Sequence, residues 1–134
     1  MPTIYFFLTH RASRGISIEH LGIMEQEKKE VLKGTLDMLV LKVVAFGPIH
    51  GYAISQRIQQ ISKDFFQVPE GSLYPALHRL EDKGWLQAKW EETDTGREAK
   101  VYSLTRAGRK RLEAEMENWE RLSEAVALIL KTAQ

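Results

Sequence analysis

The segment from Val68 to Thr105 constrains the fold more than any other part of the chain. Within it, Leu73, Leu77 and Leu80 recur at spacings of three and four residues. This periodicity predicts a helix with one face in a hydrophobic core, starting near residue 71 or 72. Pro75 then falls in the first turn of that helix, where its missing N–H costs little.

Two short strands are expected directly after this helix. The residues from Trp85 to Glu92 alternate, which places Leu86, Ala88 and Trp90 on one face. The return strand covers Arg97 to Leu104, after a turn that contains glycine. A helix followed by a β-hairpin is typical of a winged helix-turn-helix, in which a recognition helix and a wing face DNA. The expected fold class is therefore mainly α with a small β-hairpin.

Two further helices are predicted upstream. The first runs from about Thr35, acting as N-cap, to Phe46, and Gly47-Pro48 ends it. The second begins near Gly51, and a linker from Lys63 to Pro69 follows it. The residues expected to face inward are Leu36, Leu39, Val40, Val43, Ala53, Ile54, Ile58, Ile61, Phe65, Phe66 and Val68.

A long final helix is predicted from Thr105, as N-cap, to about Leu130. Its apolar residues recur at spacings of three and four: Leu112, Met116, Trp119, Leu122, Val126 and Ile129. This stripe extends beyond what a small helical core can cover. We therefore expect the helix to pair with a second copy and form a homodimer.

The charge is distributed unevenly. The net charge of the 134 residues is +1, but Trp85 to Arg111 holds seven basic and four acidic residues. Residues Leu112 to Gln134 hold two basic and five acidic residues. This asymmetry favours a phosphate-facing surface before the final helix and a partner-facing surface on it, although such imbalances also occur on solvated faces.

Several classes of function and location are disfavoured by residues that are missing. The chain has no cysteine, and its four histidines are not spaced as metal ligands, so neither a metal nor a cofactor is expected. It has no glycine-rich phosphate loop and no Gly-x-Ser-x-Gly motif, so we do not expect an enzyme. The longest apolar run is too short to cross a bilayer and no signal peptide is recognisable, so we expect a cytoplasmic protein with no membrane partner.

Three motifs carry a family resemblance. The strings GPIHGYAI, GSLYPALHRLEDKGW and KVYSLTRAG resemble the PadR family of bacterial transcriptional regulators, most closely its short branch with one C-terminal helix. The resemblance covers about Leu32 to Leu130 and departs at Ser72, where family members often have threonine. It implies a homodimeric repressor of transcription that occupies a palindromic operator and is released by a ligand or signal. The recognition helices would lie about 34 Å apart, one turn of DNA.

The resemblance also divides the chain into three parts. Family members commonly begin only a few residues before the Lys-Gly-Thr-Leu segment, so we expect residues 1–23 to be a flexible extension and Met24 to be the natural start. Residues 24–105 would form the DNA-binding domain and residues 106–134 the dimerisation helix.

Candidate contacts to double-stranded DNA lie on the third helix, on the hairpin and before the second helix. The third helix offers small, hydroxyl and cationic side chains and the hairpin offers cations, while the family places the counterpart of Tyr52 near the DNA backbone. The candidates are Tyr52, Ser72, Tyr74, Pro75, His78, Arg79, Lys89, Arg97 and Lys100. Simple solvation, and ion pairs across the hairpin with its glutamates, are the alternatives.

Trp119 has two interpretations. It falls in the middle of the final stripe, where a large aromatic residue usually forms interface core. In some short PadR-like proteins a tryptophan in this context faces its symmetry mate, and planar aromatic ligands stack between the pair. Glu117-Asn118-Trp119 matches that context, so a planar aromatic effector stays open as a partner.

Two other functions remain open. One is a winged helix used as a protein-interaction module without specific DNA binding. The other is a ligand-binding dimer with only residual affinity for DNA.

Overall fold

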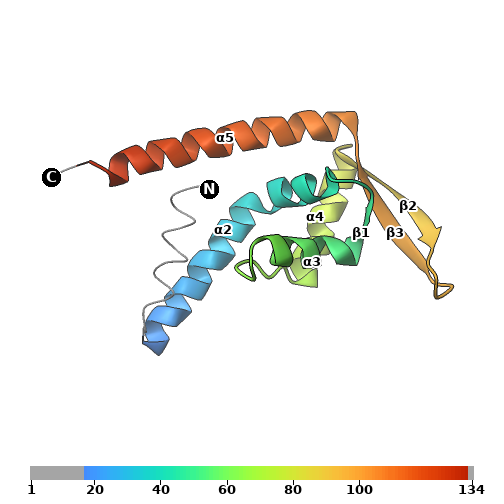
Figure 1. The fold of residues 1–134 in the computed structure, drawn as a ribbon, viewed down its shortest axis with the longest axis horizontal. Coiled ribbons are helices and arrows are strands. Elements are labelled where there is room, and N and C mark those ends of the chain that lie inside the picture. The colour runs from blue at the N-terminus through green and yellow to red at the C-terminus, as the bar shows by residue number, and fades with distance from the viewer. Residues whose placement is uncertain (1–16, 133–134) are drawn as a thin grey trace.

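The computed structural model describes residues 17–132, which form a mainly helical fold with a small antiparallel sheet. The elements are α2 (Ile18–Val44), β1 (Ile49–His50), α3 (Gly51–Ile61), α4 (Glu70–Asp82), β2 (Leu86–Glu92), β3 (Glu98–Leu104) and α5 (Arg106–Leu130). In Figure 1 the hairpin of β2 and β3 extends away from the packed helices, and α5 runs as a long separate arm. This arrangement confirms the predicted fold class.

Helix α2 is much longer than the sequence indicated. It begins at Ile18, so Thr35 lies inside the helix and its hydroxyl donates to the carbonyl of Val31 at 2.7 Å. The prediction of Thr35 as N-cap was therefore wrong, because the strong helix formers upstream of it continue the same helix. The helix also crosses the expected boundary at residue 24, while residues 1–16 of the predicted extension lie outside the described residues.

The hydrophobic core lies where α2, α3 and α4 meet the sheet. Of the predicted stripe on α4, Leu73 is 1% exposed and Leu77 and Leu80 are fully buried. Ile61 was placed inward but is 56% exposed, because α3 ends there and the chain turns through positive φ at residues 63 and 64. Other predicted core residues are buried, namely Leu36, Val40, Val43, Ile54, Ile58 and Phe66, while Leu39, Phe65 and Val68 pack against them partly buried.

Pro75 is not in the first turn of α4, contrary to the prediction. Helix α4 begins at Glu70 with Pro69 as N-cap, so Pro75 lies in the second turn. A proline there removes one helical hydrogen bond, and this cost falls on the exposed side of the helix.

The sheet has the order β1-β3-β2, with β3 in the centre. Strand β1, which the sequence analysis missed, pairs Ile49 with Tyr102 and His50 with Val101. It ties the start of α3 to the root of the hairpin. A two-residue strand has no alternation that a sequence pattern can detect.

Helix α5 follows β3 after the single residue Thr105, and this residue is hydrogen-bonded to the turn just after α4. As predicted, Thr105 caps it, and the Thr105 hydroxyl accepts from the N–H of Gly108 at 2.9 Å. The same hydroxyl donates to the carbonyl of Gly84 at 2.6 Å, and the N–H of Thr105 donates to the carbonyl of Trp85 at 3.1 Å. A Cβ on Gly108 would collide with that Trp85 carbonyl, so glycine is what lets the two segments approach so closely.

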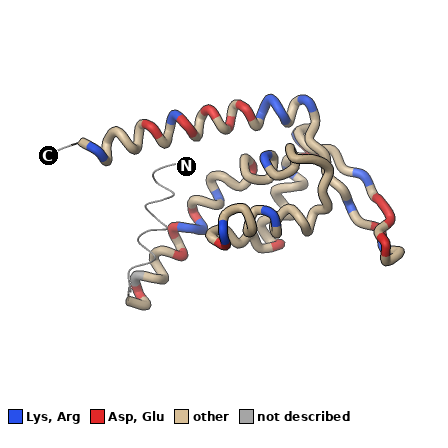
Figure 2. Tube along the Cα trace, in the orientation of Figure 1, with Lys and Arg blue, Asp and Glu red and all other residues tan. Residues whose placement is uncertain are grey.

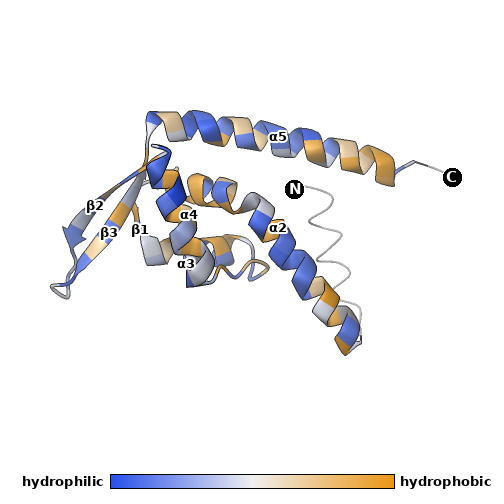
Figure 3. Ribbon diagram, turned by 180° about the vertical axis from the view of Figure 1, so that it is seen from behind, coloured by the Kyte–Doolittle hydropathy of each residue, from blue (hydrophilic) through white to orange (hydrophobic). Residues whose placement is uncertain are grey.

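Beyond this junction, α5 leaves much of its apolar surface uncovered. Leu112 is buried, but Met116, Leu122 and Ile129 are 43%, 56% and 74% exposed. Figure 3 shows the hydrophobic positions recurring along the whole arm. No helix within residues 17–132 is long and apolar enough to span a membrane.

Candidate nucleic-acid interface

The side of α4 away from the core is open. Tyr74, Pro75 and His78 are exposed there, and Ser72 is half-buried at one flank. The N-terminal turns of a recognition helix are the part that contacts base edges. The structure therefore leaves these predicted contacts accessible for that role.

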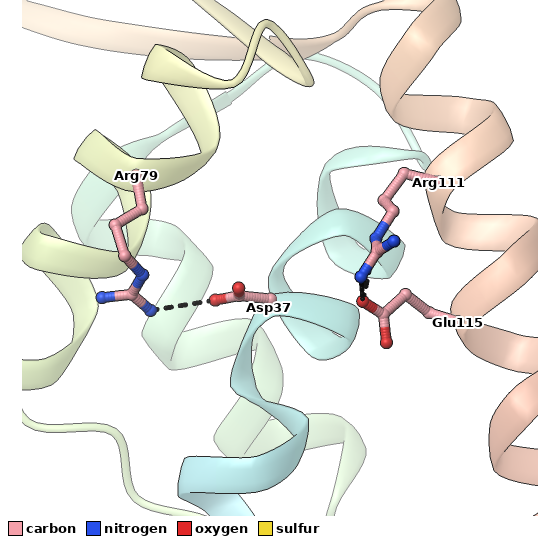
Figure 4. Close-up of polar contacts among 4 residues, drawn as sticks. All are labelled: Asp37, Arg79, Arg111 and Glu115. Carbon is pink, nitrogen blue, oxygen red and sulfur yellow. Dashed lines mark hydrogen bonds and ion pairs between the residues drawn. The ribbon is translucent and has the colours of Figure 1, made fainter.

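Arg79 points to the flank of α4 that faces α2. Its Nη2 lies 3.0 Å from Oδ1 of Asp37, as Figure 4 shows. The side chains of Arg79 and Asp37 are 53% and 31% exposed, and ion pairs with such access to water contribute only about 0–1 kcal/mol. A DNA phosphate would therefore compete with Asp37 for Arg79 at little cost.

Tyr52 lies on the opposite flank, at the start of α3. Its ring is 55% exposed and stacks on His50 at 5.6 Å between centroids. A Cβ on Gly51 would lie 3.3 Å from the Tyr102 ring and 3.4 Å from the Tyr74 ring. The missing side chain of Gly51 thus lets the start of α3 approach both α4 and the hairpin root.

The three candidate cations of the hairpin differ in environment. Arg97 is exposed, and the side chain of Lys89 is 79% exposed with Glu91 3.8 Å away. Lys100 instead turns toward α4, where its Nζ donates to Oε1 of Glu81 at 3.0 Å and its side chain is only 25% exposed. Arg97 and Lys89 are free to meet a DNA backbone, whereas Lys100 links the hairpin to the recognition helix.

The contact between Lys100 and α4 alters two pKa values. The hydrogen bond to Glu81 raises the pKa of Lys100 above its usual 10.5. Burial disfavours the phenolate and raises the pKa of Tyr102 above its usual 10.0. The cation of Lys100 and the neutral phenol of Tyr102 are therefore the forms that the folded state favours.

Trp90 is exposed, although the strand pattern placed it on the same face as Leu86, which is buried. It pairs in register with Lys100 and is 63% exposed, because the hairpin extends past the core at this point. Alternation along a strand identifies a shared face but cannot show where the core ends.

The basic residues that start α5 are not beside the open turns of α4. Arg106, Arg109, Lys110 and Arg111 follow the Thr105 junction, which is bonded to Gly84 at the C-terminal end of α4. Figure 2 shows this cationic start of α5 and the acidic residues farther along the arm. Arg111 pairs with Glu115 at 2.8 Å, drawn in Figure 4, and lies over the Trp85 ring. The cluster of basic residues noted in the sequence therefore lies near the C-terminal end of the recognition helix, away from its open N-terminal turns.

Trp119 lines a groove between α2 and α5. The groove has a volume of about 620 Å³, and Met38, Leu39, Met116 and Ser123 also line it. Trp119 and Val126 are half-buried. Within the described part of the chain, no group of His, Asp and Glu residues is arranged to hold a metal ion.

Known proteins share this arrangement. The family profile described as "Transcriptional regulator PadR-like family" matches residues 40–114. A transcriptional regulator from Mycobacterium tuberculosis is 33% identical over 98 residues, which cover 73% of this chain and 88% of the relative.

Two solved structures support the same assignment. A PadR family transcriptional regulator from Eggerthella lenta is similar with a TM-score of 0.75 at 27% identity, over 87% of this chain and 100% of that one. A PadR-like transcriptional regulator from Bacillus cereus gives a TM-score of 0.67 at 27% identity, over 78% and 99% of the two chains.

Proposed function

Because the chain belongs to the PadR-like family of transcriptional regulators and is therefore a DNA-binding regulator rather than an enzyme, we propose that it acts as a homodimeric repressor on a palindromic operator in the cytoplasm. Residues 24–105 supply the DNA-binding domain and residues 106–134 the dimerisation helix. The candidate contacts are Tyr52, Ser72, Tyr74, Pro75 and His78, together with Arg79 and the hairpin cations.

The uncovered stripe of α5 is the observation that carries the dimer. Ile129 and Leu122 are 74% and 56% exposed on a helix whose first turns are firmly rooted in the winged fold. Large apolar patches on a single chain usually mark an interaction site. A second copy offers the same stripe, and a two-fold pair of recognition helices matches a palindromic site.

Mobility shifts on the DNA upstream of the protein's own gene test this function. Specific binding that weakens steeply with salt, at two chains per site, is expected. Among variants, His78→Ala should lower the affinity for the operator more than that for random DNA, while Arg97→Ala should lower both alike. An absence of binding even at low salt would favour a protein-interaction module instead.

The groove beside Trp119 supports a finer proposal, a planar aromatic effector. An indole beside an apolar groove offers a stacking surface for a flat ligand. Planar aromatic compounds should quench part of the tryptophan fluorescence, and this part should vanish in Trp119→Ala while Trp90→Ala keeps it. Quenching that is unchanged in Trp119→Ala would leave Trp119 as interface core only.

A further inference from the structure

A second, larger groove adjoins the recognition helix on the side away from the hairpin. Its volume is about 890 Å³, and it is lined by residues 25–36 of α2, by α3, by the loop of residues 64–69 and by the start of α4. Ser72, Pro75 and Arg79 form part of its wall, and Lys29 and Lys33 of α2 form another part. The groove therefore places cations of α2 next to the candidate contacts of α4.

The two flanks of α4 have different neighbours. On one flank Glu81 is bonded to Lys100 of the hairpin, and on the other Arg79 is bonded to Asp37 of α2. A helix in the major groove, which is about 12 Å wide, has a phosphate backbone on each side. One backbone would pass the hairpin and Tyr52, and the other would pass the middle of α2, residues 25–36.

The lysines on that second side are available. Lys28 is held by Glu25 at 3.4 Å and lies over the Phe65 ring. Lys29 and Lys33 are exposed, and no carboxylate of the described residues lies within ion-pair distance of either. An unpaired cation beside a recognition helix is suited to a phosphate.

We infer that Lys29 and Lys33 bind the phosphate backbone on the side of α4 opposite the hairpin. The recognition helix would then lie between two cationic anchors, Arg97 and Lys89 of the hairpin and the two lysines of α2. This inference rests on the proposed function, since it assumes that α4 enters the major groove. It goes further by assigning a DNA contact to a helix outside the helix-turn-helix and the wing.

The slope of log Kobs against log salt tests the inference in the full-length protein. Each lost phosphate contact reduces the steepness of this slope by about 0.9. Lys33→Ala should therefore flatten the slope by about 0.9 for each protomer bound, equally on operator and random DNA, and adding Lys29→Ala should double the effect. The ratio of operator to random affinity should stay unchanged.

Lys42→Ala is the matched control. Lys42 is an exposed lysine on the same helix, but it lines the groove between α2 and α5 instead. Its loss changes the net charge equally and should leave the slope as in the wild type. If the wild type binds DNA and Lys33→Ala behaves like Lys42→Ala, the inference is overturned; if the wild type binds no DNA, the proposed function itself fails.

Discussion

Helices α4 and α5 carry the same kind of apolar stripe, yet the chain buries only one of them. Leu73, Leu77 and Leu80 of α4 are at most 1% exposed, because α2, α3 and the sheet surround that face. On α5 Leu112 is 5% exposed, whereas Ile129 near the other end is 74% exposed. Helical periodicity thus identifies a face that needs covering, but within residues 17–132 the apolar residues Met116, Leu122 and Ile129 of α5 stay largely exposed.

The largest expected effect comes from making the same substitution in both helices. Leu77→Ala should lower the free energy of unfolding by about 2–5 kcal/mol, because it opens a cavity in a closed core. Leu122→Ala should change the unfolding of the monomer by less than about 0.5 kcal/mol. Chemical denaturation at low protein concentration measures both values.

Leu122→Ala should instead weaken self-association, which sedimentation equilibrium detects. Equal losses of monomer stability in the two variants would show that α5 is covered within the chain and would remove the contrast between the helices.

The junction between the two regions is tested by Gly108→Ala. The new methyl group would meet the carbonyl of Trp85 and lie 2.8 Å from Cδ1 of Leu104, so overpacking should cost about 1–3 kcal/mol. Gly34→Ala on α2 is the control, since a Cβ there has no neighbour within 4 Å. That control should stabilise the protein by about 0.5–1 kcal/mol through helix propensity. Thermal unfolding distinguishes these opposite signs.

Removing the cap of α5 should have a smaller effect. Thr105→Ala removes the acceptor for the Gly108 N–H and the donor to Gly84, at a cost of about 1 kcal/mol. Thr105→Ser retains the hydroxyl and should recover most of that loss in the same unfolding measurement. A serine variant as unstable as the alanine variant would show that the methyl group matters and the cap does not.

The smallest expected effect is the loss of stability at alkaline pH, which involves Lys100 and Tyr102 of β3. Both Lys100 and Tyr102 have pKa values raised in the folded state, so their contribution to stability is complete below about pH 10 and is lost as the pH rises through the folded values. The free energy of unfolding should therefore fall as the pH rises from about 9 to about 11, the range in which lysine and tyrosine side chains lose their protons. Tyr102→Phe should fall less steeply, and Leu122→Ala should match the wild type.

Sequence patterns predicted the buried faces better than the ends and neighbours of the elements. The stripe on α4 and the Thr105 cap are local in sequence, and the structure confirms both. The start of α2 was misplaced, because Thr35 can cap a helix but also fits inside one.

The environments of the candidate contacts depend on residues far away in the chain. Lys100 meets Glu81 nineteen positions upstream, and Arg79 meets Asp37 forty-two positions upstream. No local spacing predicts either pair. Lys29 and Lys33 were missed for the same reason, since only the folded chain brings α2 beside the start of α4.

The hydrogen bonds that tie the start of α5 to the turn after α4 have a consequence for operator length. Helix α5 spans 25 residues, about 37 Å, and the residue before it, Thr105, is hydrogen-bonded to Gly84, just beyond the end of the recognition helix. In a dimer joined through α5, these bonds would resist a change in the separation of the half-sites. One extra base pair between them turns one half-site by about 35° around the DNA axis. The protein should therefore select its sites by the number of intervening base pairs as strictly as by their identity.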